Sequence, residues 1–144
     1  MDTQNPFGCT ITTEDIIETL SFFDTWEERY KYIIDLGKEL PPLADDKKTE
    51  AYLVRGCQSQ VWIDFEVDDV VRLNADSDAF IVKGLLGVVL AAYNGKTPKA
   101  VLAFDIESYL DQLGLIKHLS LTRGNGLKAM VQRIHELALT SEQH

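Results

Sequence analysis

The sequence predicts an α+β fold in which a small antiparallel β-sheet packs against several α-helices. Residues 60–76 contain two runs of alternating apolar and polar side chains, separated by Asp68-Asp69, as in a β-hairpin. On both sides of these runs, apolar residues recur at helical spacing behind residues that favour helix starts. The chain has 144 residues without a repeat or linker, so we assign residues 1–144 to one domain with a buried core.

The first two helices are predicted from their starts. Residues 1–11 lack apolar periodicity and are expected to form a flexible lead-in that contains Cys9. Thr12 is then expected to cap one helix, and Thr25 begins a capping-box pattern for a second. Gly37 is expected to end the second helix.

The middle of the chain is expected to hold the hairpin and a buried helix. Asp-Asp-Lys-Lys at 45–48 reads as an exposed, solvated turn before the hairpin. After the hairpin, apolar residues fill most positions from about 79 to 93, a length that favours a buried helix over a strand. Ser77 or Asp78 is expected to cap this helix, and Gly84 and Gly87 would permit close packing against another element.

Three more helices complete the prediction. Thr97-Pro98 starts a short one, and the apolar spacing over 106–113 indicates another that is closed by Gly114. The last helix is expected to begin after residues 122–126, with His135 on its outer part. We expect its inner face to contain Leu127, Met130, Ile134 and Leu137.

Charge excludes two classes of partner. Fourteen Lys and Arg against 23 Asp and Glu give a net charge of −9, so the chain lacks the basic footprint of a nucleic-acid-binding protein. The same charge disfavours anionic membrane surfaces. The most apolar run, 85–93, is too short to span a bilayer. We therefore expect a cytoplasmic protein that docks onto other proteins.

One of the two cysteines stands in a distinctive setting. Cys57 follows Gly56 and precedes the polar residues Gln58, Ser59 and Gln60, just ahead of the first strand. A glycine allows a sharp turn, so the thiol is expected at a loop tip, where it is available for chemistry. The two cysteines show no zinc-ligand spacing, and neither a disulfide, a metal nor a bound cofactor is expected.

Four stretches together resemble the SufE/CsdE family of sulfur acceptors. Gly-Cys-Gln-Ser-Gln-Val-Trp at 56–62 is the most specific. Trp-Glu-Glu-Arg-Tyr at 26–30, Asp-Ser-Asp at 76–78 with Ile-Val-Lys-Gly-Leu at 81–85, and Arg123 ahead of Gly-Leu at 126–127 are similar as well. The resemblance covers roughly residues 12–138 and implies the α+β fold that the family shares with IscU-like iron–sulfur scaffold proteins.

The resemblance implies a sulfur carrier rather than a stand-alone enzyme. Such a protein takes sulfane sulfur from a PLP-dependent cysteine desulfurase of the SufS/CsdA type, enhances its turnover, and passes the sulfur to a downstream acceptor or scaffold for iron–sulfur cluster assembly. The pyridoxal phosphate belongs to the partner. Cys57 is the implied persulfide residue and Arg123 a second catalytic candidate. The candidates for partner docking are Arg55, Gly56, Gln58, Ser59, Gln60, Asp76, Ser77 and Asp78.

Two alternatives stay open at this point. Gln58-Ser59-Gln60 resembles the SufE branch, whereas the lead-in at 5–12 resembles the CsdE branch. A cysteine-dependent hydrolase would need a base near Cys57, and His118 is the candidate.

The sequence also suggests how the thiol is activated and protected. Arg55, Lys83 or Arg123 would raise the thiolate fraction of Cys57 if close to it. A persulfide is easily oxidised, so we expect Cys57 to be substantially buried in the free protein and its loop to swing out on docking. The residues expected to line its pocket are Val54, Val61, Leu85 and Leu86.

Overall fold

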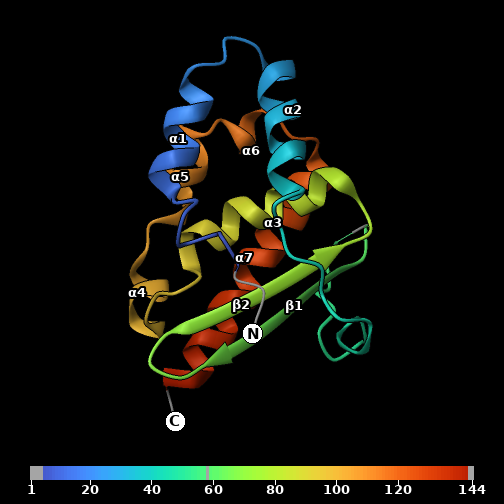
Figure 1. The fold of residues 1–144 in the computed structure, drawn as a ribbon, viewed down its shortest axis with the longest axis vertical. Coiled ribbons are helices and arrows are strands. Elements are labelled where there is room, and N and C mark those ends of the chain that lie inside the picture. Colours follow the sequence, from blue (N-terminus) through green and yellow to red (C-terminus); the bar gives the residue numbers. More distant parts are fainter. Residues whose placement is uncertain (1–4, 58, 143–144) are drawn as a thin grey trace.

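Helix α3 (Phe80–Tyr93) lies at the centre of the fold and contacts elements from both ends of the chain (Figure 1). All of its residues except Phe80 and Lys83 are buried, which confirms the predicted buried helix. The computed structural model describes residues 5–57 and 59–142. In it, the elements that pack on α3 are α1 (Thr13–Ser21), α2 (Trp26–Gly37), β2 (Val71–Ser77), α4 (Pro98–Ala103) and α7 (Leu121–Glu142).

The predicted hairpin is confirmed. Strand β1 (Val61–Val67) pairs antiparallel with β2, in a register that places Val61 opposite Ser77 and Val67 opposite Val71. The preceding segment adds to the outer edge of β1, because Val54 N donates to Val61 O at 2.7 Å and Ile63 N donates to Tyr52 O at 2.9 Å. The chain between 54 and 61 is therefore closed into a loop at the end of the sheet.

The turn at 45–48 is less solvated than its charges suggested. It contains a short 3-10 helix, η1 (Asp45–Lys47), and its lysines reach buried carboxylates on the hairpin. Lys47 Nζ lies 2.9 Å from Asp64 Oδ2, and Lys48 Nζ lies 3.4 Å from Asp76 Oδ2. The prediction of an exposed turn is confirmed for Asp45 and Asp46 and is wrong for the two lysines, because each buried carboxylate needs a cation to offset the loss of its hydration.

The predicted flexible lead-in is also wrong for residues 5–11, which are packed against the core. Phe7 is 0% exposed, and its ring occupies the space beside Gly87 of α3. Asn94 Nδ2 donates to Phe7 O at 2.9 Å, and Asn5 Nδ2 donates to Leu73 O at 3.0 Å. A single aromatic anchor and two amide side chains fix a segment that has no periodicity of its own.

The starts of α1 and α2 agree with the sequence. Thr12 and Thr25 each accept a hydrogen bond from the third helical backbone N–H and complete a capping box. Gly37, by contrast, is the last helical residue of α2 and not its C-cap. A Cβ on Gly37 would lie 2.7 Å from Gly84 N, and one on Gly84 would lie 2.0 Å from Ile33 O. These two glycines let α2 and α3 approach closely, as predicted for Gly84.

The C-terminal helices follow the prediction until the last one. Thr97 caps α4, and α5 (Ile106–Gln112) precedes Gly114, which is left-handed and leads into the short α6 (Leu115–His118). Helix α7 begins at Leu121, earlier than predicted, because Ser120 Oγ accepts a hydrogen bond from Arg123 N at 3.3 Å. Its buried apolar face contains Leu127, Met130, Ile134 and Ala138; Ala138 takes the place predicted for Leu137.

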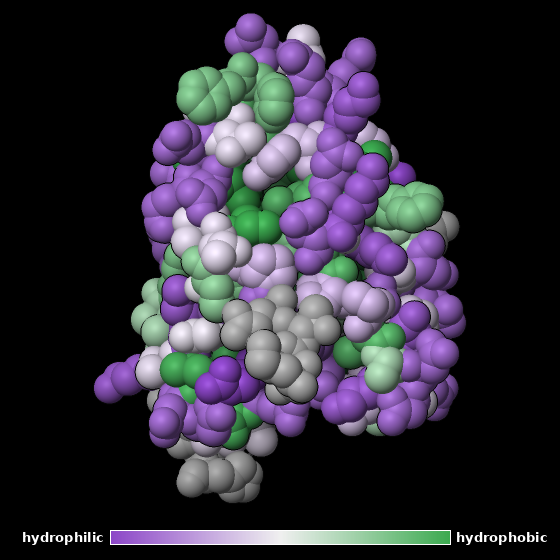
Figure 2. All heavy atoms as spheres, viewed as in Figure 1, coloured by the Kyte–Doolittle hydropathy of each residue, from purple (hydrophilic) through white to green (hydrophobic). Residues whose placement is uncertain are grey.

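The architecture confirms the predicted fold class. Among the described residues, seven α-helices and one two-stranded antiparallel sheet form an α+β fold. Figure 2 shows a largely hydrophilic surface on the face in view. Nowhere in residues 5–57 and 59–142 is a helix both long and apolar enough to cross a membrane.

Candidate functional site

Cys57 lies in the closed loop between residue 54 and strand β1. Gly56 has φ +93°, a left-handed conformation that side chains rarely adopt, and a Cβ there would lie 3.3 Å from Ala129 Cβ of α7. Glycine therefore serves two purposes at this position: it makes the turn and it lets the loop approach α7. The sequence predicted the turn, and the structure adds the helix against which it rests.

The far end of the loop is tied to the junction between β2 and α3. Gln60 N donates to Asp78 Oδ1 at 3.1 Å, and Gln60 O accepts from Ser77 Oγ at 2.7 Å and from Asp78 N at 3.3 Å. Ser77 Oγ also accepts a hydrogen bond from Ala79 N at 3.3 Å, and Ala79 is the N-cap of α3 where Ser77 or Asp78 was predicted. The loop is thus fixed by three hydrogen bonds at one residue.

The Cys57 thiol is half-buried and faces a small cavity. Sγ donates to the carbonyl oxygen of Gly126 in α7 at 3.5 Å. The cavity has a volume of about 120 Å³, and Leu85 is the one predicted pocket residue among those that line it. Val54, Val61 and Leu86 lie elsewhere in the core. The lining residues are Cys57, Ser59, Ala79, Ile81, Val82, Leu85, Thr122, Arg123, Gly126 and Met130.

Burial raises the pKa of the Cys57 thiol above its ordinary value. Loss of hydration is the cause, and no neighbouring cation offsets it among the described residues. Lys83 Nζ instead pairs with Asp76 Oδ1 at 3.5 Å, and the Arg123 guanidinium lies 5.8 Å from the centre of the Tyr30 ring. In this conformation burial is the only influence on the pKa of the Cys57 thiol, so activation of the thiol by these cations stays a prediction.

Asp76 and Ser77 support the site from within. Asp76 is 3% exposed and accepts hydrogen bonds from Leu43 N at 3.2 Å and Ser77 N at 2.8 Å. Burial alone would raise the pKa of Asp76, but these hydrogen bonds and the nearby Lys83 and Lys48 outweigh it, so the net pKa is lowered. Both side chains are buried in the free protein, and only Asp78 of this triplet is exposed to a partner.

The other docking candidates gather around the thiol. Arg55, Gly56 and Gln60 are exposed, and Ser59 is half-buried in the cavity wall. Arg123 is exposed and lines the same cavity from the first turn of α7. Gln58 lies outside the described residues. The fold thus brings to one place residues that are more than 60 positions apart in the sequence, although their role in docking stays a prediction.

The two histidines in the described part of the chain, His118 and His135, do not assemble a hydrolase site with Cys57. His118 stacks on Trp26 with ring centres 4.8 Å apart and is not among the residues that line the cavity. His135 is half-buried, against the expectation of an outer position, because its Nε2 lies 3.0 Å from the Tyr93 hydroxyl oxygen. Burial lowers the pKa of His135.

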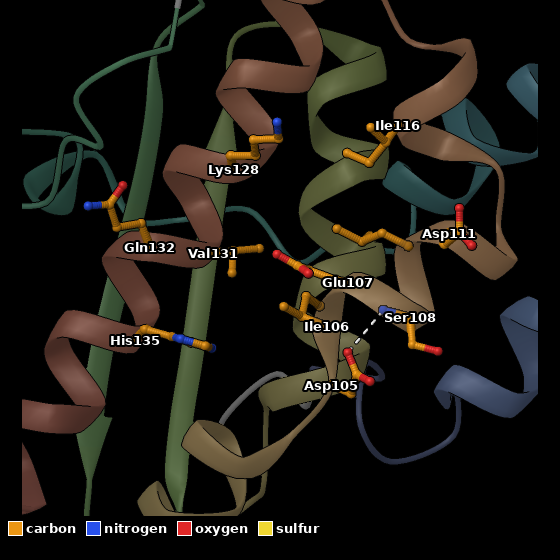
Figure 3. Close-up of a pocket in the computed structure, with 11 residues that line it drawn as sticks. Asp105, Ile106, Glu107, Ser108, Asp111, Ile116, Lys128, Val131, Gln132 and His135 are labelled. Carbon is orange, nitrogen blue, oxygen red and sulfur yellow. Dashed lines mark hydrogen bonds between the residues drawn. The ribbon is translucent and has the colours of Figure 1, made fainter.

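A second, larger hollow also lacks an assembled catalytic group. It is a groove of about 910 Å³ between α5, α6 and α7, and its walls include Asp105, Ser108 and His135 (Figure 3). Asp105 Oδ1 accepts a hydrogen bond from Ser108 N at 3.1 Å and so caps α5, while the Ser108 hydroxyl points away from His135. The three residues belong to one groove but do not form the relay that a serine hydrolase needs.

Cys9 differs from Cys57 in every respect that matters for a protected thiol. It is exposed in the turn after Phe7 and does not line the Cys57 cavity, and both cysteines are free. The described residues contain no group of three or more His, Cys, Asp or Glu side chains that could hold a metal ion. Fold and site together define a class: a small α+β protein with one half-buried thiol on a tethered loop beside a helix.

Comparisons with known proteins identify the family within that class. The SufE family model, described as an Fe-S metabolism associated domain, matches residues 14–138. An uncharacterized SufE-like protein of Rhizobium etli is 43% identical over 130 residues, which cover 87% of this chain and 88% of that protein. Another from Rhizobium meliloti is 41% identical over 127 residues, covering 84% and 90%. The chain belongs to the SufE family.

A solved structure shares the fold. The solution structure of a hypothetical protein from Thermus thermophilus matches with a TM-score of 0.74 and 21% identity, covering 99% of this chain and 100% of that one. This likeness supports the architecture, whereas the family assignment rests on the sequence matches.

Proposed function

We propose that this protein is a sulfur acceptor that carries sulfane sulfur as a persulfide on Cys57 for iron–sulfur cluster assembly. The observation that carries the proposal is the placement of the thiol: Cys57 Sγ is half-buried in a small cavity, on a loop whose outer residues Arg55, Gly56 and Gln60 are exposed. Membership of a family associated with Fe-S metabolism supports the same conclusion.

The chemistry needs one thiolate and a persulfide donor. The Cys57 thiolate attacks the outer sulfur of a persulfide on the donor's cysteine. A new S–S bond forms on Cys57 as the S–S bond of the donor breaks, and the donor cysteine leaves as a thiolate. The exchange has no net oxidation or reduction, so it requires no bound cofactor on this chain. The donor we propose is a PLP-dependent cysteine desulfurase, which holds the pyridoxal phosphate and makes the persulfide from cysteine.

The resting site protects the thiol at the expense of its reactivity. Burial raises the pKa of Cys57, which lowers its thiolate fraction at neutral pH, and the surrounding wall of Ile81, Val82, Leu85 and Met130 limits access of oxidants. We propose that docking moves the loop outward, which rehydrates the thiol and brings its pKa back toward the ordinary value. The donor must bind the open loop more tightly than the closed one, since equal affinity would shift nothing.

The cavity has a second use once sulfur is loaded. A persulfide is one sulfur atom longer than a thiol, and the space beside Cys57 Sγ is about 120 Å³, several times the volume share of a water molecule. The loaded loop could therefore close again with the extra sulfur inside the apolar wall. Release would occur on a downstream scaffold or acceptor. We place this relay in the cytoplasm, where reducing conditions keep an unpaired thiol free.

The test compares the two cysteines in the reaction of the donor. A purified PLP-dependent cysteine desulfurase from the same organism is supplied with cysteine, and alanine release is measured with and without this protein. Wild type and Cys9→Ser should enhance turnover, whereas Cys57→Ser should not, because only Cys57 can relieve the donor of its sulfur. Enhancement that survives Cys57→Ser and is lost in Cys9→Ser would overturn the proposal.

A further inference from the structure

Two large apolar side chains stand exposed beside the Cys57 cavity. Phe80 is 75% exposed in the first turn of α3, and Leu121 is 81% exposed in the first turn of α7. Single exposed apolar residues are common on protein surfaces and by themselves need no explanation. The position of this pair distinguishes them from the exposed apolar residues elsewhere.

Both residues are immediate chain neighbours of residues that line the cavity, which places them beside its mouth. Phe80 stands between Ala79 and Ile81, which line the cavity, and Leu121 directly precedes Thr122 and Arg123, which line it too. The two helix starts therefore each contribute an inward-facing wall and an outward-facing apolar side chain. Figure 2 shows apolar atoms projecting from the edge of the molecule where α3 begins.

Sulfur transfer requires the donor protein to contact this protein close to the Cys57 cavity. The outer sulfur of the donor has to come into contact with Cys57 Sγ, which lies at a cavity of only about 120 Å³. A cavity of that size cannot admit a protein segment, and the Cys57 loop moves outward from its mouth on docking, so the donor surface that meets the thiol lies against the mouth. Apolar side chains at the mouth then leave water, which favours association.

We propose that Phe80 and Leu121 are apolar anchors on which the sulfur-donating protein docks. The inference rests on the proposed function and adds the surface that the donor recognises. The matching donor carries apolar side chains around its persulfide. Arg55 and Arg123 are exposed at the same mouth, in a chain whose net charge is −9, so the donor surface also presents carboxylates toward them.

The chain offers a matched control for the anchors. Phe22 is 74% exposed, as much as Phe80, but it follows α1 at the connection to α2. That connection lies at the end of the molecule away from the hairpin (Figure 1). A general stickiness of exposed aromatic residues would act through Phe22 and Phe80 alike, whereas a docking surface at the mouth would involve Phe80 and Leu121 only.

The experiment measures affinity and loading separately. The dissociation constant is measured with a purified PLP cysteine desulfurase whose own catalytic cysteine is replaced by serine. The proteins compared are wild type, Phe80→Ser, Leu121→Ser, Phe80→Leu and Phe22→Ser. Persulfide loading of Cys57 is then measured with the active desulfurase at saturating concentration. Thermal unfolding confirms that each variant is folded. Interface anchors of this size usually change affinity by about tenfold or more.

We expect Phe80→Ser and Leu121→Ser each to weaken binding about tenfold, with loading at saturation as in wild type. Phe80→Leu should restore most of the affinity, and Phe22→Ser should bind normally. Unchanged affinity of Phe80→Ser and Leu121→Ser would overturn the proposal that these residues are anchors, and so would an equal loss of affinity in Phe22→Ser. The proposed sulfur relay would still stand in either case if the wild-type protein loads Cys57. Failure of wild type to load Cys57 would overturn the proposed function and the anchors with it.

Discussion

Removal of the Asp78 carboxylate should loosen the cysteine loop in the free protein. Gln60 N donates to Asp78 Oδ1 at 3.1 Å, and this is the one side-chain acceptor that holds the loop amide of Gln60. Both residues are exposed, so the bond stabilises the closed loop by about 0.5–1 kcal/mol, the lower part of the usual range. The bond from Ser77 Oγ to Gln60 O stays in place and keeps the effect modest.

That free energy corresponds to about a twofold to fivefold increase in the open population. In a Cys9→Ser background, alkylation of Cys57 by iodoacetamide should accelerate by this factor in Asp78→Ala, and exchange of the Gln60 amide should accelerate with it. Asp78→Asn retains an acceptor oxygen and should react nearly as slowly as the parent. An Asp78→Ala variant with parental alkylation and parental exchange at Gln60 would refute the reasoning, because the loop would then not depend on this bond.

Three further predictions concern the fold and the thiol. Gly84→Ala should destabilise the protein by about 3 kcal/mol or more, since its Cβ would lie 2.0 Å from Ile33 O. Gly124→Ala in α7 is the control, because its Cβ meets nothing within 4 Å, and it should stabilise the protein by about 0.5–1 kcal/mol. Urea unfolding measures both changes. Phe7→Ala should cost about 3–5 kcal/mol by the same measurement, and a near-neutral effect would mean that the N-terminal segment is not packed. The raised pKa of Cys57 means that its alkylation in the free protein should rise with pH at a midpoint above about 8.5, and a midpoint below that value would contradict burial of the thiol.

The parts of the fold that the sequence predicted well depend on local chemistry. Thr12 and Thr25 cap their helices as predicted, and Asp68-Asp69 lies in the turn between the two predicted strands. These features involve residues within a few positions of one another, so their patterns are visible without knowledge of the tertiary structure.

The parts that it missed depend on distant partners. Phe7 has no periodic neighbours, and only the gap beside Gly87 makes it a core residue. Lys47 and Lys48 were predicted to be solvated because their partners are distant in the sequence. These partners, Asp64 and Asp76, lie on the two strands of the hairpin. Gly-Asn-Gly at 124–126 disfavours a helix locally, yet Ser120 starts α7 ahead of it. Tertiary contacts outweigh local propensity for Phe7, Lys47 and Lys48, whereas the early start of α7 depends on the local hydrogen bond from Arg123 N to Ser120 Oγ.

The candidate site shows the same division. The reactive position could be read from Gly56 and Cys57, because a glycine turn before a strand has a local signature. Its burial and the contribution of Leu85 were predicted, but the rest of the wall was not, since it comes from Ile81 and Val82 of α3 and from Met130 of α7, far along the chain. The raised pKa of the thiol is a consequence of burial against that wall, and none of the candidate cations offsets it in this conformation.

The central claim is that Cys57 itself carries the sulfur, and peptide mass spectrometry tests it most directly. The protein is incubated with a PLP-dependent cysteine desulfurase and cysteine, the thiols are alkylated, and the peptides that contain Cys9 and Cys57 are analysed. We predict one additional sulfur atom on the Cys57 peptide, absent when cysteine is omitted and discharged by a reducing thiol. Additional sulfur on Cys9 with none on Cys57 would contradict the account.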